Sequence, residues 1–298
     1  MSKSLLLTNL VIFALLLHLC KGSLLATTFT SKQNDTIALL STQTGRAIRS
    51  SNSMGSYVEI YDNAAYDPLS HMAMLYGISD GMNTLDFYNV DTLQMERQIV
   101  LEGNNAPVDI QYDMTYPGQL LAISGIGPAF AIVFYDLKSG NKSEIMPLKD
   151  VVEMSESTQA YDTKNHRYYT AVSMSNNGPI TYNVYNIKTR TLERNITVPT
   201  SLDNTQFDRF GNRLVGLVND VYCYVDLESG QFVKTGVDLS NVGFRQLGAS
   251  AIDTNYYYVF YENHSAQSFF VKIDLKTLAV RVEQVYDLIG TLLFVPGK

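Results

Sequence analysis

The stretch "YVDLESGQFVKT", residues 224–235, reads as the end of one β-strand, a tight turn and the start of the next strand. Asp226 stands before the turn, and Gly230 supplies a residue that takes positive φ without steric cost. A short side chain such as that of Asp226 accepts hydrogen bonds from backbone N–H groups two or three residues later, which initiates a turn. The stretch therefore predicts a β-hairpin.

Similar hairpins recur along the chain at a nearly constant spacing. Aligned on Asp226, the equivalent residues lie at intervals of 48, 47, 50, 40 and 48 residues: Ser41, Asn89, Asp136, Asn186, Asp226 and Asp274. The residue before each of them is large and apolar, and the third residue after it is Ser or Thr. We predict that these six residues are structural turn anchors, one in each repeat.

A second repeated aspartate lies between these hairpins, in segments such as "AYDPL", "QYDMT" and "QFDRF". The members are Asp67, Asp113, Asp162, Asp208 and Asp253. Each follows an apolar or aromatic residue and precedes turn-forming residues, after which an apolar run begins. Each unit therefore reads as four strands, and these aspartates are interpreted as caps of turns rather than as an acidic binding ring.

Four-stranded units repeated every ~40 to 50 residues predict an all-β fold, the β-propeller. Six hairpins predict six blades. The first unit lacks an Asp-bearing strand, whereas residues 291–295 form a spare strand at the end of the chain. We therefore expect the C-terminal strand to complete the first blade and close the ring. A seven-bladed ring with one degenerate blade is the alternative.

Through "YVDLESGQFVKT" and its five relatives, the chain resembles the broad WD40-like and YVTN-type propeller superfamily, and this resemblance implies the fold alone. The chain contains no Trp, which excludes the Trp-Asp dipeptide of strict WD40 blades. Sequence motifs of serine hydrolases, zinc proteases and P-loop proteins are also absent.

The N-terminus has the layout of a secretory signal peptide: Lys3 is followed by an apolar run from Leu5 to Cys20 and by the small residue Gly22. We predict a signal at residues 1–22 and a propeller domain at 23–298, which makes the protein secreted and leaves it without a membrane segment. An uncleaved membrane anchor is the alternative, for which the run is short. Four glycosylation sequons agree with secretion: Asn34, Asn141, Asn195 and Asn263.

Charge and cysteine content restrict the partners and the chemistry. The net charge is −7, and loss of Lys3 and Lys21 with the signal leaves 20 basic and 29 acidic residues, or −9. Nucleic acid is therefore not expected as a partner. Cys223 would be the only mature cysteine and is interpreted as a small buried residue. His71 and His166, each four residues after a repeated aspartate, are interpreted as exposed turn residues.

Loops between the second and third strands of each blade are the predicted place for a ligand. Their oxygen-bearing residues could converge on Ca²⁺, in resemblance to the six-bladed calcium-dependent lactonases and esterases. The candidate ligands are Asp35, Asp80, Asn176, Asp220 and Glu262. The sequence favours a protein without a cofactor, and Ca²⁺ bound by these residues is the alternative.

Three functions remain open at this point. The sequence favours a non-enzymatic module that binds a protein or a glycan, because no nucleophile, base or ligand set is assembled in it. The alternatives are a calcium-dependent hydrolase and a structural extracellular component.

Overall fold

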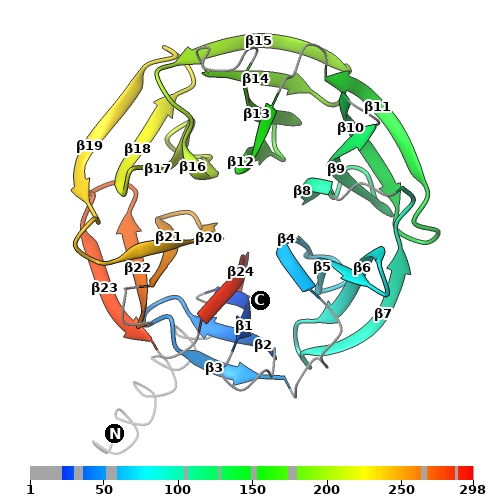
Figure 1. The fold of residues 1–298 in the computed structure, drawn as a ribbon, viewed down its shortest axis with the longest axis horizontal. Coiled ribbons are helices and arrows are strands. Elements are labelled where there is room, and N and C mark those ends of the chain that lie inside the picture. Colours follow the sequence, from blue (N-terminus) through cyan, green and yellow to red (C-terminus); the bar gives the residue numbers. More distant parts are fainter. Residues whose placement is uncertain are drawn as a thin grey trace, which may run out of the picture.

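The computed structural model describes residues 22–29, 36–51, 59–103, 107–126, 129–148, 153–173, 180–262, 267–285 and 288–297. Over these ranges the chain forms 24 β-strands in six four-stranded antiparallel sheets. The sheets are arranged radially around a central channel (Figure 1). The predicted six-bladed β-propeller is confirmed, and the seven-bladed alternative is wrong.

Each blade has four strands, which we call A to D from the channel outward. Blade 1 consists of β24 (Leu288–Val295), β1 (Ser23–Phe29), β2 (Thr36–Ser41) and β3 (Ala47–Ser50). Blade 2 consists of β4 (Glu59–Asp67), β5 (Met72–Ser79), β6 (Met82–Asn89) and β7 (Gln94–Val100). Blade 3 consists of β8 (Pro107–Tyr112), β9 (Gln119–Ile126), β10 (Ala129–Asp136) and β11 (Lys142–Leu148).

The remaining blades repeat the same order. Blade 4 consists of β12 (Glu153–Asp162), β13 (Arg167–Ser173), β14 (Ile180–Asn186) and β15 (Thr191–Val198). Blade 5 consists of β16 (Asp203–Asp208), β17 (Arg213–Val218), β18 (Val221–Asp226) and β19 (Phe232–Asp238). Blade 6 consists of β20 (Phe244–Ile252), β21 (Tyr256–Glu262), β22 (Ser268–Asp274) and β23 (Val280–Val285).

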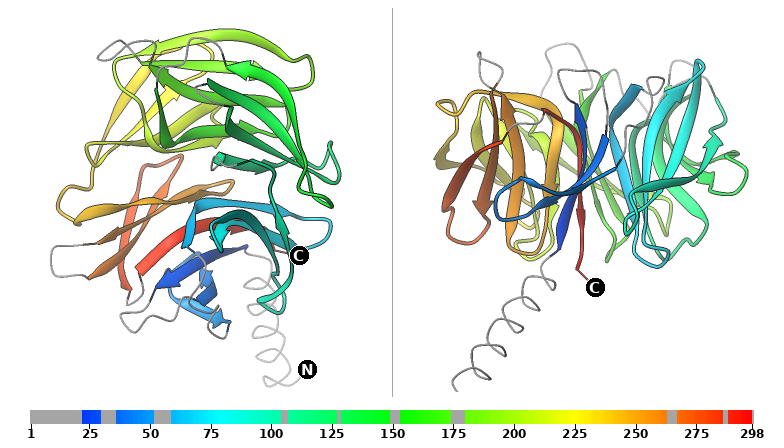
Figure 2. Two further views of the ribbon diagram at one scale, coloured as in Figure 1. Left: turned by 45° about the vertical axis from the view of Figure 1, so that its right-hand side comes forward. Right: turned by 90° about the horizontal axis from the view of Figure 1, so that it is seen from below.

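The last strand closes the ring, as predicted. β24 pairs antiparallel with β1, and Val295 lies opposite Ser23. The C-terminal strand is thus strand A of the blade that begins the chain, and neither the first nor the last blade lacks its inner strand. The start of β1 and the C-terminus consequently lie together on one face of the disc (Figure 2).

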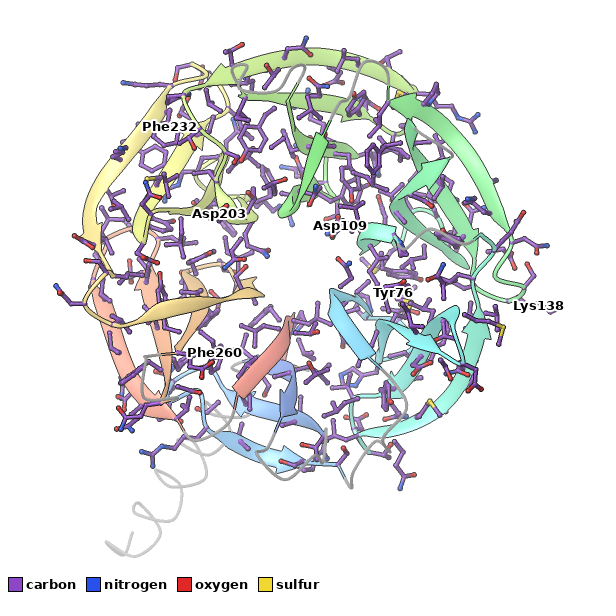
Figure 3. The ribbon with its side chains drawn as sticks, in the orientation of Figure 1. Tyr76, Asp109, Lys138, Asp203, Phe232 and Phe260 are labelled. Carbon is purple, nitrogen blue, oxygen red and sulfur yellow. The ribbon has the colours of Figure 1, made fainter. Side chains whose placement is uncertain are left out.

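Apolar side chains are buried between the blades. Six clusters of buried residues each join two neighbouring blades; one of them contains Leu75 of blade 2 and Ile37 of blade 1. Both faces of strands B and C are covered in this way, which is why strands such as "YYYVFY" (256–261) are apolar throughout and do not alternate. Tyr76 and Phe260 are fully buried and mark two of these interfaces (Figure 3).

The six anchor residues begin the turns between strands C and D. Asp226 Oδ1 accepts hydrogen bonds from the backbone N–H of Ser229 at 2.7 Å and from its hydroxyl at 2.7 Å. Side-chain oxygens of the other five anchors accept backbone N–H groups in the same way. The fourth residue after each anchor has positive φ: Gly45, Leu93, Gly140, Arg190, Gly230 and Leu278.

The turns define two faces of the disc. The A–B and C–D turns lie on one face, which we call the AB face. The B–C turns and the connections between blades lie on the opposite face, which we call the BC face. The described residues form no helix of the length and hydrophobicity needed to span a membrane.

Candidate functional site

A cavity of about 860 Å³ occupies the central channel. Residues of all six A strands line its wall, and exposed residues of the A–B turns, such as Thr163 and Thr254, lie around its mouth. The cavity therefore opens on the AB face. The predicted ligand loops between strands B and C belong to the BC face, and none of their described residues lines it.

A collar of large apolar side chains surrounds the channel near its mouth. The collar residues immediately precede the repeated aspartates, or their equivalent Val295: Tyr66, Tyr112, Tyr161, Phe207, Ile252 and Phe294. Each packs into a different one of the six clusters between blades. Five members are partly exposed to the channel, whereas Tyr161 is buried. The repeat thus produces an aromatic-rich ring by using one position in every blade.

Exposed apolar side chains extend the collar onto the AB face. Leu69, Met114 and Phe210 lie in the A–B turns of blades 2, 3 and 5 and are 73%, 54% and 72% exposed. Met114 and Phe210 also line the cavity. We call these three residues the rim. Apolar side chains clustered around a cavity mouth are a feature of binding surfaces.

The repeated aspartates bind their own turns. Asp208 Oδ1 accepts the N–H groups of Phe210 and Gly211, each at 3.0 Å, and Oδ2 pairs with Arg213 Nε at 2.8 Å. The other four members likewise accept a backbone N–H group two residues later. Their carboxylates therefore cap the turns that carry the rim.

Cationic side chains connect five of the six pairs of neighbouring blades. In each case Arg or Lys donates to the carbonyl oxygen of the residue that follows the turn anchor in the next blade. The pairs are Arg49 with Val90, Arg97 with Leu137, Arg194 with Leu227, Arg213 with Leu275 and Lys272 with Thr42. Among the described residues, the equivalent carbonyl of Ile187 in blade 4 has no cationic donor. Blades 3 and 4 are joined differently.

Asp113 joins blade 3 to blade 4 through two side chains. Its Oδ2 accepts the Tyr161 hydroxyl at 2.5 Å and lies 2.9 Å from His166 Nδ1, while Oδ1 accepts the N–H of Thr115 at 2.8 Å. Burial alone would raise the pKa of Asp113, but the hydrogen bonds from Tyr161, Thr115 and His166 outweigh it and lower the pKa. This carboxylate is therefore held in its charged form.

Asp109 lies four residues earlier, on β8, deeper in the channel wall, and has a different environment. It accepts hydrogen bonds from the buried Tyr168 of blade 4 and, at 3.1 and 3.2 Å, from Gln111 of its own strand. Burial raises the pKa of Asp109 to about 6, because the hydrogen bonds from Tyr168 and Gln111 only partly compensate for it. Figure 3 shows Asp109 at the inner margin of the ring, and its side chain lines the cavity.

The two turn histidines are placed as predicted but are less exposed than expected. His71 and His166 adopt positive φ, 58° and 54°, and each carbonyl accepts a backbone N–H from the adjacent C–D turn. Both are partly buried, and His166 contacts Asp113. The interpretation as exposed residues is therefore wrong: Tyr66 and Asp91 of its own blade lie against His71, whereas Asp113 and Tyr116 of the neighbouring blade lie against His166. Cys223 is buried, and burial raises the pKa of its thiol.

The predicted calcium ligands are only partly described. Asp80 and Asp220 lie in B–C turns of blades 2 and 5 with φ of 52° and 63°, and Glu262 ends β21. Asp35 and Asn176 lie outside the described residues. Within the described part of the chain, no three His, Cys, Asp or Glu side chains come together as a group that could hold a metal. The calcium site stays a prediction.

Calcium dependence can be tested by thermal unfolding. If the predicted residues bind Ca²⁺, 2 mM CaCl₂ should raise the melting temperature relative to EDTA, because an ion bound only to the folded state stabilises it. The variant Asp80→Asn/Asp220→Asn should abolish that rise. Equal melting curves of the wild-type protein in CaCl₂ and in EDTA would contradict the prediction.

Two of the four predicted glycosylation sites are described. Asn141 and Asn195 are both exposed, on a C–D turn and on the outer strand β15. Asn34, Asn263 and the predicted signal peptide, apart from Gly22, lie outside the described residues. Glycosylation and secretion stay predictions.

Comparisons with known proteins agree on the fold. The propeller resembles a chain of a nidogen/laminin complex, with a TM-score of 0.66 and 11% identity over 93% of this chain and 99% of that chain. It also resembles TolB from Acinetobacter baumannii, with a TM-score of 0.68 and 10% identity over 92% of this chain and 67% of that one. No family model and no curated protein sequence matches the chain.

A third similarity is to the β-propeller domain of Cps50 (Swd1) from Myceliophteria thermophila, with a TM-score of 0.55 and 10% identity over 91% of this chain and 90% of that chain. At these identities the likeness shows the fold alone. The protein is thus a six-bladed β-propeller, and the resemblance to WD40-like and YVTN-type propellers is confirmed at the level of the fold.

Proposed function

We propose that this propeller is a secreted binding module that holds a segment of another protein on its AB face. The observation that carries the proposal is the exposed rim of Leu69, Met114 and Phe210 on the AB face, of which Met114 and Phe210 line the collared cavity. Water surrounds these side chains in the free protein, and their burial by a partner would contribute about 25 cal/mol per Å² of apolar surface.

The chemistry of the rim supports a protein partner more than a glycan. Met and Phe are enriched in protein interfaces, where apolar side chains fill pockets of the partner surface. The partner in turn would place an apolar residue against the partly exposed collar, which includes Tyr66, Tyr112 and Phe207. The propeller supplies a rigid frame, because six buried clusters fix the blades and so limit the entropy lost on binding.

Peptide selection tests this proposal. Peptides selected on the wild-type protein from a random displayed library should carry aromatic or aliphatic anchor residues. Their affinity should fall at least tenfold, about 1.4 kcal/mol, for Leu69→Ser/Phe210→Ser, because two of the three rim side chains are lost. Titration with synthetic copies of the selected peptides measures the change.

The matched control removes apolar surface elsewhere. Val280 and Val282 are exposed on the outer strand β23, and Val280→Ser/Val282→Ser should leave the affinity unchanged. Equal binding of the selected peptides to both double variants would contradict a site on the AB face. Binding on a glycan array together with a failed peptide selection would instead favour a glycan ligand. Concentration-dependent self-association in sedimentation would favour a structural component.

A further inference from the structure

Asp109 is a carboxylate deep in the channel wall, and no cationic side chain in the described part of the chain lies beside it. Tyr168 and Gln111 are its side-chain partners, and among the described residues no Arg, Lys or His pairs with it. At the five other junctions between blades a cationic side chain donates to a carbonyl oxygen of the neighbour, whereas at this junction a carboxylate accepts from a tyrosine. A desolvated carboxylate without a counter-ion is costly, and such a group in a cavity wall is a candidate for a functional site.

The position of Asp109 in the repeat sets it apart. The residue four before the repeated aspartate is uncharged in the other blades that carry that aspartate, where it is Asn63, Thr158, Asn204 or Ala249. The other blades therefore fold with a neutral side chain at this position, and the fold does not require a carboxylate there. The carboxylate of blade 3 is an addition to the repeat, and it faces the cavity.

Aromatic rings lie between Asp109 and the AB face. Tyr112 of the collar is three residues nearer the mouth on the same strand, a separation of about 10 Å for an extended chain. A ligand that enters from the AB face passes the collar before it reaches the carboxylate. Aromatic faces followed by a carboxylate form a site that suits a cation on an apolar stem, through cation–π attraction and charge pairing.

Acidic and basic residues at the mouth of the cavity balance each other, so their charges do not repel an approaching cation. Lys164 and Arg209 line the cavity on exposed A–B turns, where water screens them, and Asp113 and Asp253 lie at the same end. Asp109 is the one charged residue that the described wall carries below the collar. The whole chain has a net charge of −7, which favours the approach of a basic partner.

We propose that the protein partner inserts an extended segment into the channel and that a guanidinium or ammonium group of this segment binds the carboxylate of Asp109 below the collar. This inference rests on the proposed function and specifies the chemistry of the partner. The aliphatic stem of an Arg or Lys side chain packs against the collar while the charged end reaches the carboxylate.

Two synthetic probes test the charge requirement. The first is fluorescein-Phe-Gly-Ser-Arg-amide, in which an aromatic and a basic residue are three positions apart, as Tyr112 and Asp109 are in the wall. The second replaces Arg with citrulline, which has nearly the same shape and no charge. Fluorescence anisotropy at pH 7.5 should show that the Arg probe binds the wild-type protein at least tenfold more tightly than the citrulline probe. For Asp109→Asn the two affinities should agree within twofold.

A charge control and a folding control accompany the experiment. Glu228→Gln removes one negative charge from an exposed C–D turn of the AB face and should keep the tenfold preference. Circular dichroism melting establishes that Asp109→Asn is folded. Equal affinities of the two probes for the wild-type protein would overturn the inference, as would a preference that persists in Asp109→Asn. Failure of both probes to bind also overturns it, whereas the proposed function is judged separately by the selected peptides and the rim variant.

Discussion

Gly140→Ala is expected to lower the free energy of unfolding by about 2–5 kcal/mol, the largest single loss that we anticipate from adding one methyl group. Gly140 has φ of +75°, where an L-residue loses roughly 1–2 kcal/mol. An added Cβ would also lie 1.9 Å from the carbonyl oxygen of Val100 in blade 2. Displacing packed backbone adds about 1–3 kcal/mol. Thermal or urea-induced unfolding measures the loss.

Gly81→Ala is the matched control for this variant. Gly81 has the same φ of +75°, but an added Cβ would meet nothing within 4 Å. Its loss should therefore be limited to the backbone contribution of roughly 1–2 kcal/mol. If both variants were equally stable, the close contact between blades 2 and 3 at Val100 would be wrong.

Asp109→Asn is expected to stabilise the protein at pH 7.5, by up to about 3 kcal/mol. The pKa of Asp109 is about 6 in the folded protein, above the ordinary value of 3.8, so ionisation at neutral pH opposes folding. Two pKa units correspond to about 3 kcal/mol. Between the two pKa values the folded state binds more protons than the unfolded state, so this group makes folding less favourable as pH rises. The gain from the variant should thus be full at pH 7.5, shrink below pH 6 and vanish near pH 4.

Asp113→Asn, directly after the strand that carries Asp109, should behave in the opposite way. The pKa of Asp113 is lowered in the folded state, so its charge stabilises the fold above its ordinary pKa, and this contribution is lost as pH falls. The variant should be less stable than the wild-type protein at pH 7.5, because Tyr161 and His166 lose a charged acceptor. Unfolding measured in urea from pH 4 to pH 8 separates the two carboxylates. A loss of stability in Asp109→Asn at every pH would show that the carboxylate is needed for structure.

The repeat explains how much of the fold is predictable from the sequence. Turn chemistry is local, so Asp226 and its five equivalents mark the hairpins without any knowledge of tertiary structure. The spare strand at residues 291–295 needs a partner, and the incomplete first blade is the one that lacks it. Both inferences use only the period and the requirement that strand edges be paired.

The site depends on contacts that the period does not specify. Asp109 and Tyr168 are 59 residues apart, and His166 meets Asp113 across 53 residues. The collar does have a sequence signal, because an apolar residue precedes every repeated aspartate. That signal does not show that the residue lines the channel, which follows from the twist and tilt of the blades. The predicted ligand loops lie on the BC face, whereas the cavity opens on the AB face.

Connections between blades carry a further signal that sequence reasoning missed. Arg49, Arg97 and Arg194 each lie eight residues after a turn anchor, and each reaches the next blade. The equivalent residues of blades 5 and 6 are Lys234 and Val282, and blade 3 alone has an acidic residue there, Glu144. A comparison of repeats within the chain would therefore have drawn attention to the junction between blades 3 and 4, where Asp109 and Asp113 lie.

Because β24 closes the ring, the propeller can complete its fold only after β24 has been synthesised. Because β1 is synthesised before β24, the strands of blades 2 to 6 must emerge from the ribosome before β1 acquires its neighbour on the channel side. Until then the inner edge of β1 has unpaired backbone N–H and C=O groups, which can pair with another chain unless chaperones bind the nascent protein. A product that ends before β24 would have a permanent opening in its inner wall, and we expect cellular quality control to degrade it.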